Sequence, residues 1–213
     1  MALVPLDIIT PIHNAFRKGL TDIDDAVYDI AKNGGDLSPV LAQLTEYNKY
    51  LEYHAGGEED AVFPAVEKIA PQVAKAFDMD HRELDVMSEA TEKVLNAKNE
   101  LDAARGTASY WTHLRVHLAK EDAFLYPLLR AGISEAEQGP IVGIMASKTP
   151  HDQMPGLIAW VTRNTTRDER ETVNRIWKSL MPEQVYSNVK GVVKDSMTAD
   201  DWADLTKRVP ELA

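Results

Sequence analysis

The sequence predicts an all-α protein, built as an up-down-up-down four-helix bundle with a C-terminal helical extension. Strand-like alternation is scarce, long stretches carry apolar residues at helical spacing, and short Pro- or Gly-containing segments separate these stretches. Apolar residues make up 44% of the 213 residues, which is enough for a sizeable core. We expect the bundle domain over residues 1–132 and an extension over residues 133–213 that packs on it.

Two long helices are predicted in the first third of the chain. The first begins near Pro11, or earlier near Pro5, and is ended by Asn-Gly-Gly at residues 33–35. The second begins with Ser-Pro at residues 38–39 and leads through apolar residues at helical spacing to His54. The short connection between them favours an antiparallel pair.

The next two long helices repeat this arrangement. The third begins at Pro71 and carries His81. Ala-Arg-Gly-Thr at residues 104–107 is expected to end it and to cap the fourth helix, which carries His117. The two antiparallel pairs would then face each other about a pseudo-twofold axis.

The extension is expected to hold shorter amphipathic helices. Acidic residues follow Thr166 and Thr198, as they do at helix starts, where negative charge suits the helix dipole. Tryptophans 160, 177 and 202 are plausible packing anchors. The predicted segments are 135–164, 168–180, 183–195 and 199–208.

One chemical pattern occurs twice in the bundle region. Each copy has a histidine, a glutamate four residues later and a proline six residues after that. Residues four apart stack on one helix face about 6 Å apart, so an imidazole and a carboxylate can bind one ion together. Each proline is expected to kink its helix. The copies are His54, Glu58, Pro64 and His117, Glu121, Pro127.

A single histidine on the preceding predicted helix completes each copy, namely His13 and His81. One such histidine alone is more often a hydrogen-bonded core residue, and one such pair alone is often a surface ion pair. The matched repeat favours a dinuclear metal centre with four imidazoles and two bridging carboxylates. Because the chain has no cysteine, the ligands are nitrogen and oxygen. This donor set suits iron best, with manganese and zinc as weaker candidates.

These motifs resemble those of the hemerythrin-like, HHE cation-binding domains over about residues 5–132. The resemblance implies a four-helix bundle holding two non-haem iron ions with an oxo or hydroxo bridge. It also implies dioxygen, peroxide or nitric oxide as small ligands. On this chain it implies terminal ligands His13, His54, His81 and His117, with Glu58 and Glu121 as bridges.

The chain departs from the oxygen-carrying members of that family at Asp85, which stands where those members have a fifth histidine. Their fourth helix typically has an aspartate five residues after its histidine, and here Asp122 stands next to Glu121 and is a possible additional ligand. A site with fewer imidazoles holds Fe(III) better, so we expect oxidase-like or catalase-like redox chemistry supported by an unidentified electron donor. The alternatives are a non-catalytic module that binds or senses oxygen, nitric oxide or iron, and a structural bundle without metal.

Two further residues lie one helical turn before the repeated histidines. His113 precedes His117 and could be a fifth ligand or, more plausibly, a hydrogen-bond partner of the ligands. Tyr50 precedes His54 in the same way; it could donate to a bound oxygen species, although an aromatic in the bundle core is the simpler interpretation.

The overall charge limits the possible partners. A formal charge of −11 disfavours nucleic acids and acidic membranes as binding partners. The start of the chain lacks the pattern of a secretory signal, and no stretch approaches the roughly 20 apolar residues of a membrane span. We therefore expect a soluble cytoplasmic protein.

Overall fold

The structure, a computed structural model, describes residues 3–212 and contains only helices and their connections in that range. The all-α prediction is confirmed. Contacts divide the described chain into two compact units: Phe16–Ile133, and the segment up to Ala15 together with Ser134 onward. The predicted domain boundary at residue 132 and the packing of the extension on the bundle stay predictions. No helix within residues 3–212 has both the length and the apolar character needed to cross a membrane.

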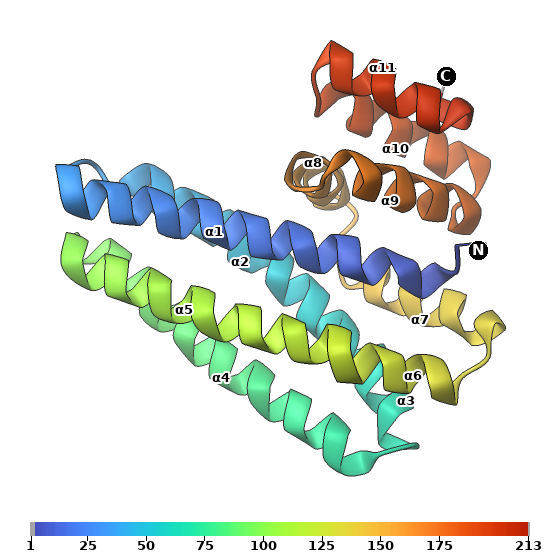
Figure 1. Cartoon of the computed structure of the whole chain (residues 1–213), viewed down its shortest axis with the longest axis horizontal. Coiled ribbons are helices and arrows are strands. Elements are labelled where there is room, and N and C mark those ends of the chain that lie inside the picture. Colours follow the sequence, from blue (N-terminus) through green and yellow to red (C-terminus); the bar gives the residue numbers. More distant parts are fainter. Residues whose placement is uncertain (1–2, 213) are drawn as a thin grey trace. The chain divides into compact units, whose positions relative to one another are not determined.

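The unit Phe16–Ile133 contains the four-helix bundle except for the first seven residues of helix α1, and the arms of the bundle alternate in direction (Figure 1). The second and fourth arms each consist of two α-helices joined by one π-helical turn. The arms are α1 (Ile9–Asn33); α2 (Ser38–Gly57) with η2 (Glu58–Val62) and α3 (Phe63–Glu67); α4 (Pro71–Asn96); and α5 (Glu100–Lys120) with η3 (Glu121–Leu125) and α6 (Tyr126–Gly132).

The predicted ends of the first two helices agree with the structure. Gly34 follows α1 with a φ of +78°, a conformation that glycine adopts without strain. Helix α2 begins at Ser38, with Pro39 in its first turn, where a missing N–H costs nothing. A short 3-10 helix, η1 (Pro5–Ile8), leads directly into α1, so the earlier of the two expected starts is the observed one.

The expected break at residues 104–107 is wrong, because these residues lie inside α5. The two helices instead meet between Asn96 and Glu100. Lys98 adopts a φ of +55° after the end of α4, and the Asn99 side chain caps α5 by accepting a hydrogen bond from a backbone N–H. A lysine in the left-handed region gives a weaker sequence signal than a glycine does.

Gly106, which suggested that break, has a packing role instead. A Cβ atom at this position would lie 2.9 Å from Cγ2 of Val94 on α4. That distance is shorter than real Cβ contacts allow, so with any larger residue either the Val94 side chain or the two helices would have to shift. Gly106 therefore permits the close approach of α4 and α5.

Each predicted proline kink is a π-helical turn. The backbone N–H of Phe63 donates to the carbonyl of Glu58, five residues back, and the N–H of Tyr126 donates to that of Glu121. A proline cannot make the ordinary backbone bond of a helix, and the wider turn before it accommodates that loss. Pro64 and Pro127 follow within the first turns of α3 and α6.

Buried tyrosines tie the arms of the bundle together through their hydroxyl groups. The Tyr47 hydroxyl donates to the Phe16 carbonyl at 3.1 Å, which connects α2 to α1. The Tyr110 hydroxyl donates to the Asn48 side-chain oxygen at 3.1 Å, which connects α5 to α2. Because both rings are fully buried, these bonds hold neighbouring arms in one position relative to each other.

The second unit contains the helices after Ser134 together with the N-terminal segment up to Ala15. The expected single segment 135–164 is wrong, because Pro150 lies in a turn that separates two helices. The other three segments are confirmed, and Thr166 and Thr198 cap their helices as expected. The helices are α7 (Glu135–Ser147), α8 (Met154–Asn164), α9 (Arg167–Leu180), α10 (Glu183–Asp195) and α11 (Ala199–Arg208).

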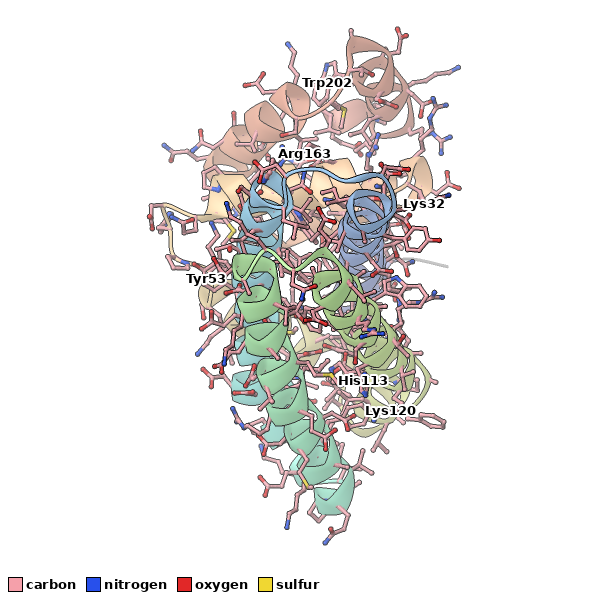
Figure 2. The ribbon with its side chains drawn as sticks, turned by 90° about the vertical axis from the view of Figure 1, so that its left-hand side faces the viewer. Lys32, Tyr53, His113, Lys120, Arg163 and Trp202 are labelled. Atoms are coloured by element: carbon pink, nitrogen blue, oxygen red, sulfur yellow. The ribbon has the colours of Figure 1, made fainter. Side chains whose placement is uncertain are left out.

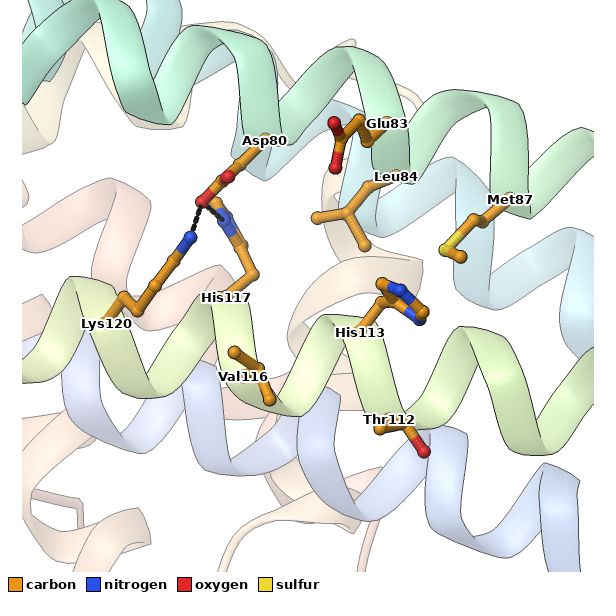
Figure 3. A pocket seen from close by; sticks show the side chains of 9 residues that line it. All are labelled: Asp80, Glu83, Leu84, Met87, Thr112, His113, Val116, His117 and Lys120. Atoms are coloured by element: carbon orange, nitrogen blue, oxygen red, sulfur yellow. Dashed lines mark hydrogen bonds and ion pairs between the residues drawn. The ribbon is translucent and has the colours of Figure 1, made fainter.

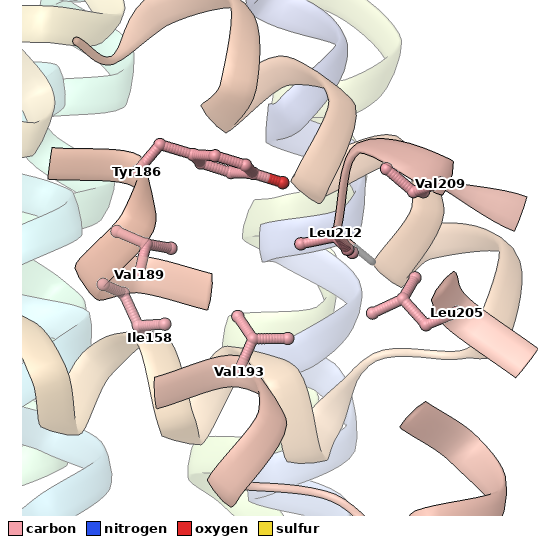
Figure 4. Close-up of a cluster of buried hydrophobic side chains, with 7 residues drawn as sticks. All are labelled: Ile158, Tyr186, Val189, Val193, Leu205, Val209 and Leu212. Carbon is pink, nitrogen blue, oxygen red and sulfur yellow. The ribbon is translucent and has the colours of Figure 1, made fainter. Parts of the chain in front are cut away.

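This unit has its own apolar core (Figure 4). Trp177 and Trp202 pack against it, as the sequence predicted, and Trp160 is buried in α8. The N-terminal segment joins the same unit through a hydrogen bond of 2.6 Å from the Asn14 amide to Glu169. The core cluster consists of Ile158, Tyr186, Val189, Val193, Leu205, Val209 and Leu212.

Candidate metal centre

The repeated glutamates lie at the first residue of the two π-helical turns and are almost completely buried. Glu58 is 1% exposed and Glu121 is 0% exposed. A buried carboxylate needs a cation or several donors to offset the loss of hydration. His54 and His117 lie against them from the same arms, and His81 of α4 lies near both.

One group of possible ligands comes from α4, α5 and η3. His81, His117 and Glu121 each offer a ligand atom, and these three atoms lie within 4.8 Å of one another. Nε2 of His117 is 3.0 Å from the Glu121 carboxylate, and Nε2 of His81 is 3.8 Å from it. All three side chains are buried, so a cation placed among them would be largely shielded from water.

A second group centres on Glu58. Its Oε1 is 3.4 Å from Nε2 of His54, and its Oε2 is 3.5 Å from Nε2 of His81. The two carboxylate oxygens therefore face imidazoles from different arms. His13 is fully buried on α1, three residues before Phe16, whose ring lies 5.3 Å from that of His54. Residues three apart share a helix face, so α1 carries His13 on the face that Phe16 presents to His54.

The charges of the glutamates dominate the electrostatics of the site. Burial lowers the pKa of His81, but its interactions with the charged carboxylates of Glu121 and Glu58 outweigh that effect and raise this pKa to about 10. Burial and the Glu58 charge raise the pKa of Glu121, but its interactions with His117 and His81 lower it more, so Glu121 is ionised. The site therefore attracts positive charge.

Comparison with protein families gives the same interpretation. The family model described as Hemerythrin HHE cation binding domain matches residues 4–129. The chain belongs to this family. Membership in the hemerythrin family, together with the two adjoining groups of histidine and glutamate, makes this a metal-binding helical bundle with donors for a di-metal centre.

Three plant proteins are similar to this chain. A zinc finger protein BRUTUS-like of Arabidopsis thaliana is 21% identical over 212 residues, covering 95% of this chain and 17% of the relative. Zinc finger protein BRUTUS of Arabidopsis thaliana is 24% identical over 152 residues, covering 67% of this chain and 12% of the relative. A further BRUTUS-like protein of the same plant is 22% identical over 187 residues, covering 81% of this chain and 15% of the relative. The chain thus spans less than a fifth of these relatives. No solved structure matches it significantly.

One contact in this hemerythrin domain was not predicted from the sequence. The Tyr126 hydroxyl donates a hydrogen bond of 2.6 Å to Oε1 of Glu58, and both groups are buried. Burial and the charges of Glu58 and Glu121 raise the pKa of Tyr126 well above its usual value, so it remains a protonated donor. The signal was available, since Tyr126 precedes its proline just as Phe63 does in the first copy.

The four additional residues predicted near the centre each have a partner outside the six candidate ligands, and their place at the centre stays a prediction. Asp85 is at the surface of α4, with Arg82 at 3.8 Å. Asp122 forms an ion pair of 2.6 Å with Arg17. The Tyr50 hydroxyl donates to Glu46 at 3.2 Å.

His113 lies on the surface of α5 (Figure 2), with its Nδ1 2.8 Å from the Ser109 carbonyl. It lines a pocket of about 250 Å³ between α4 and α5 (Figure 3). His117 lines the same pocket. The remaining lining residues are Asp80, Glu83, Leu84, Met87, Thr112, Val116 and Lys120.

Proposed function

We propose that the bundle holds two non-haem iron ions and that this centre binds and reacts with dioxygen or peroxide. The observation that carries the proposal is the position of Glu58, whose two oxygens face the imidazoles of His54 and His81. A carboxylate placed in this way can bridge two ions. Glu121, close to His81 and His117, is the second bridge. We assign His13 as the remaining terminal ligand, from its burial and its helix face.

The donor set fits iron. Four imidazoles and two carboxylates, without sulfur, suit a hard or borderline metal that accepts both nitrogen and oxygen. Manganese and zinc share part of this preference and are the weaker candidates. Iron bound here would supply electrons to dioxygen or peroxide, and repeated reduction of dioxygen would require an electron donor.

The protein side chains shape the surroundings of the site. Tyr126 donates a hydrogen bond to one oxygen of Glu58, which holds the orientation of that carboxylate. The ring of Phe63 lies 4.8 Å from that of His81, and the ring of Phe77 lies 6.0 Å from that of His117. These apolar rings keep water away from the ligands and strengthen the electrostatic interactions among them.

The size of the relatives favours a second candidate function. Because the chain corresponds to less than a fifth of each BRUTUS relative, similar segments there are parts of much larger proteins. A domain of that kind could bind oxygen, nitric oxide or iron without turnover. The predicted cytoplasmic location stays a prediction under both candidates.

Anaerobic loading with Fe(II) followed by exposure to oxygen or peroxide tests both candidates. We expect about two irons per chain in the loaded protein, oxidation on exposure to oxygen, and consumption of added peroxide. A reversible optical change without peroxide loss would favour the binding module. Less than about one metal per chain would contradict both candidates and leave a structural bundle. The matched control is Glu121→Ala, which should lose iron while retaining the helical fold.

A further inference from the structure

Two of the candidate ligands contact a carboxylate on the side of the ring away from the centre. Nε2 of His81 and Nε2 of His117 face the buried glutamates. Nδ1 of His81 is 3.1 Å from the Glu59 carboxylate. Nδ1 of His117 is 3.5 Å from the Asp80 carboxylate (Figure 3). Both ring nitrogens of each imidazole are thus engaged, one towards the centre and one away from it.

The two carboxylates belong to the neighbouring arm in each case. Glu59 follows Glu58 on the π-helical turn η2 and contacts His81 on α4. Asp80 precedes His81 on α4 and contacts His117 on α5. Glu59 and Asp80 thus each follow or precede one candidate ligand in sequence and contact a different candidate ligand on the next arm. Such an arrangement couples the orientation of one imidazole to the backbone that carries another.

Each carboxylate also pairs with a cation near the surface. Arg82 lies 3.5 Å from Glu59, and Lys120 pairs with Asp80 (Figure 3). Exposed ion pairs of this kind contribute little to stability. The carboxylates themselves are 29% and 23% exposed, so they lie between the surface cation and the buried imidazole. The outward ion pairs are ordinary for surface acids. The inward contacts with His81 and His117 are what distinguish Glu59 and Asp80.

We propose that Glu59 and Asp80 are positioning residues that fix the tautomers of His81 and His117, so that Nε2 of each ring presents its lone pair to the metal centre. A neutral imidazole has one N–H, and an acceptor at Nδ1 holds the proton there. A negatively charged acceptor also raises the electron-donating power of the ring towards a metal. This inference rests on the proposed metal centre. Glu59 would act on that centre only through His81, and Asp80 only through His117.

Metal titration of four alanine variants tests the proposal. Glu59→Ala and Asp80→Ala remove the acceptors, while Asp78→Ala and Asp85→Ala are matched controls on α4. Both controls remove a carboxylate that pairs with Arg82, and within residues 3–212 neither carboxylate forms an ion pair with a candidate ligand. With Co(II) and Zn(II) as probes, loss of either acceptor should weaken metal affinity roughly 10- to 100-fold, and the controls should match the wild type.

Two spectroscopic measurements separate positioning from simple structural damage. The Co(II) absorption spectrum should change in Glu59→Ala and Asp80→Ala, because the ligand field depends on ring orientation. In the zinc-loaded protein, the imidazole N–H signals should shift at His81 and His117 respectively. Glu59→Asp and Asp80→Glu restore a charged acceptor and should recover part of the affinity. Circular dichroism of the metal-free variants checks folding, and Glu59→Gln with Asp80→Asn replace any alanine variant that does not fold.

The outcomes distinguish this inference from the proposed function. Wild-type protein that binds neither probe would overturn the metal centre itself. Wild-type binding with unchanged affinity and unchanged spectra in folded Glu59 and Asp80 variants would overturn only the positioning role. Equal weakening in the Asp78→Ala and Asp85→Ala controls would also overturn it, since the effect would then reflect the surface charge of α4.

Discussion

The two copies of the histidine and glutamate pattern share a backbone but differ in hydrogen bonding. Both place the glutamate at the start of a π-helical turn and a proline shortly after it. At the position before the proline, the first copy has Phe63 and the second has Tyr126. The tyrosine donates to Glu58, which belongs to the first copy. The second half of the bundle therefore orients the carboxylate of the first half, which shows that a duplicated pattern can acquire unequal roles.

The largest expected effect comes from Glu58 itself, because its oxygens face imidazoles of both halves. Glu58→Ala should lower the metal content from about two ions per chain to nearly none, whereas His54→Ala should retain about one. Elemental analysis after Fe(II) loading and dialysis measures both. Equal metal content in the two variants would mean that Glu58 serves only one half.

Tyr126→Phe makes the second copy resemble the first. We expect the free energy of unfolding of the metal-free protein to fall by roughly 1.5–3 kcal/mol, because a buried hydrogen bond to a charged group is lost. Urea denaturation followed by circular dichroism measures this change. Tyr47→Phe is the matched control, since its hydroxyl donates to a neutral carbonyl at a similar depth, and its loss should cost roughly 0.5–1.5 kcal/mol. A larger loss in the control would contradict the assigned role of Tyr126.

Gly106→Ala alters the second half without changing any candidate ligand. The added methyl group would meet Val94 and should lower the stability of the bundle by about 1–3 kcal/mol through overpacking. Gly191→Ala in α10 is the control, because nothing lies within 4 Å of a Cβ there. That change should raise stability by up to about 1 kcal/mol through helix propensity. Thermal unfolding of both variants measures the difference, and the same sign in both would refute the packing role of Gly106.

The effect of pH tests the coupling of the two halves through His81, which contacts both glutamates. With its pKa raised to about 10, His81 is protonated at neutral pH in the metal-free protein. This proton stabilises the metal-free fold below pH 6.5, and the contribution is lost as pH rises through about 10. Metal binding must displace the proton, so apparent Zn(II) affinity should rise up to roughly tenfold per pH unit. Competition titrations at pH 6.5 and 7.5 measure this, and a flat profile would contradict it.

Much of the bundle could be predicted from local signals in the sequence. Glycine after α1, prolines at the starts of α2 and α4, and threonine caps in the extension each act on their own few residues. The histidine and glutamate spacing similarly identified side chains that the fold brings together. The break between α4 and α5 was misplaced because Lys98, rather than a glycine, adopts the left-handed conformation there.

The missing parts of the site depend on contacts between distant residues. Tyr126 lies far from Glu58 in sequence, as Asp80 does from His117, and neither pair has a periodic spacing that could reveal it. The π-helical turns were predicted only as proline kinks, because the sequence does not show which carbonyl accepts the hydrogen bond of a given backbone N–H. Assignment of the metal ligands themselves stays a prediction from the sequence and a proposal from the structure.

The π-helical turns also constrain how the length of this segment can change. Each such turn contains one residue more than an α-helix uses over the same stretch. Loss of a single codon within residues 58–62 would remove the excess and leave ordinary α-helical spacing, so Phe63 and Val66 would keep their buried positions. Loss of a codon within the regular helix α5 would instead rotate the residues after it by about 100°. The π-helical turn is therefore a place where this arm can shorten by one residue without turning its buried face towards water.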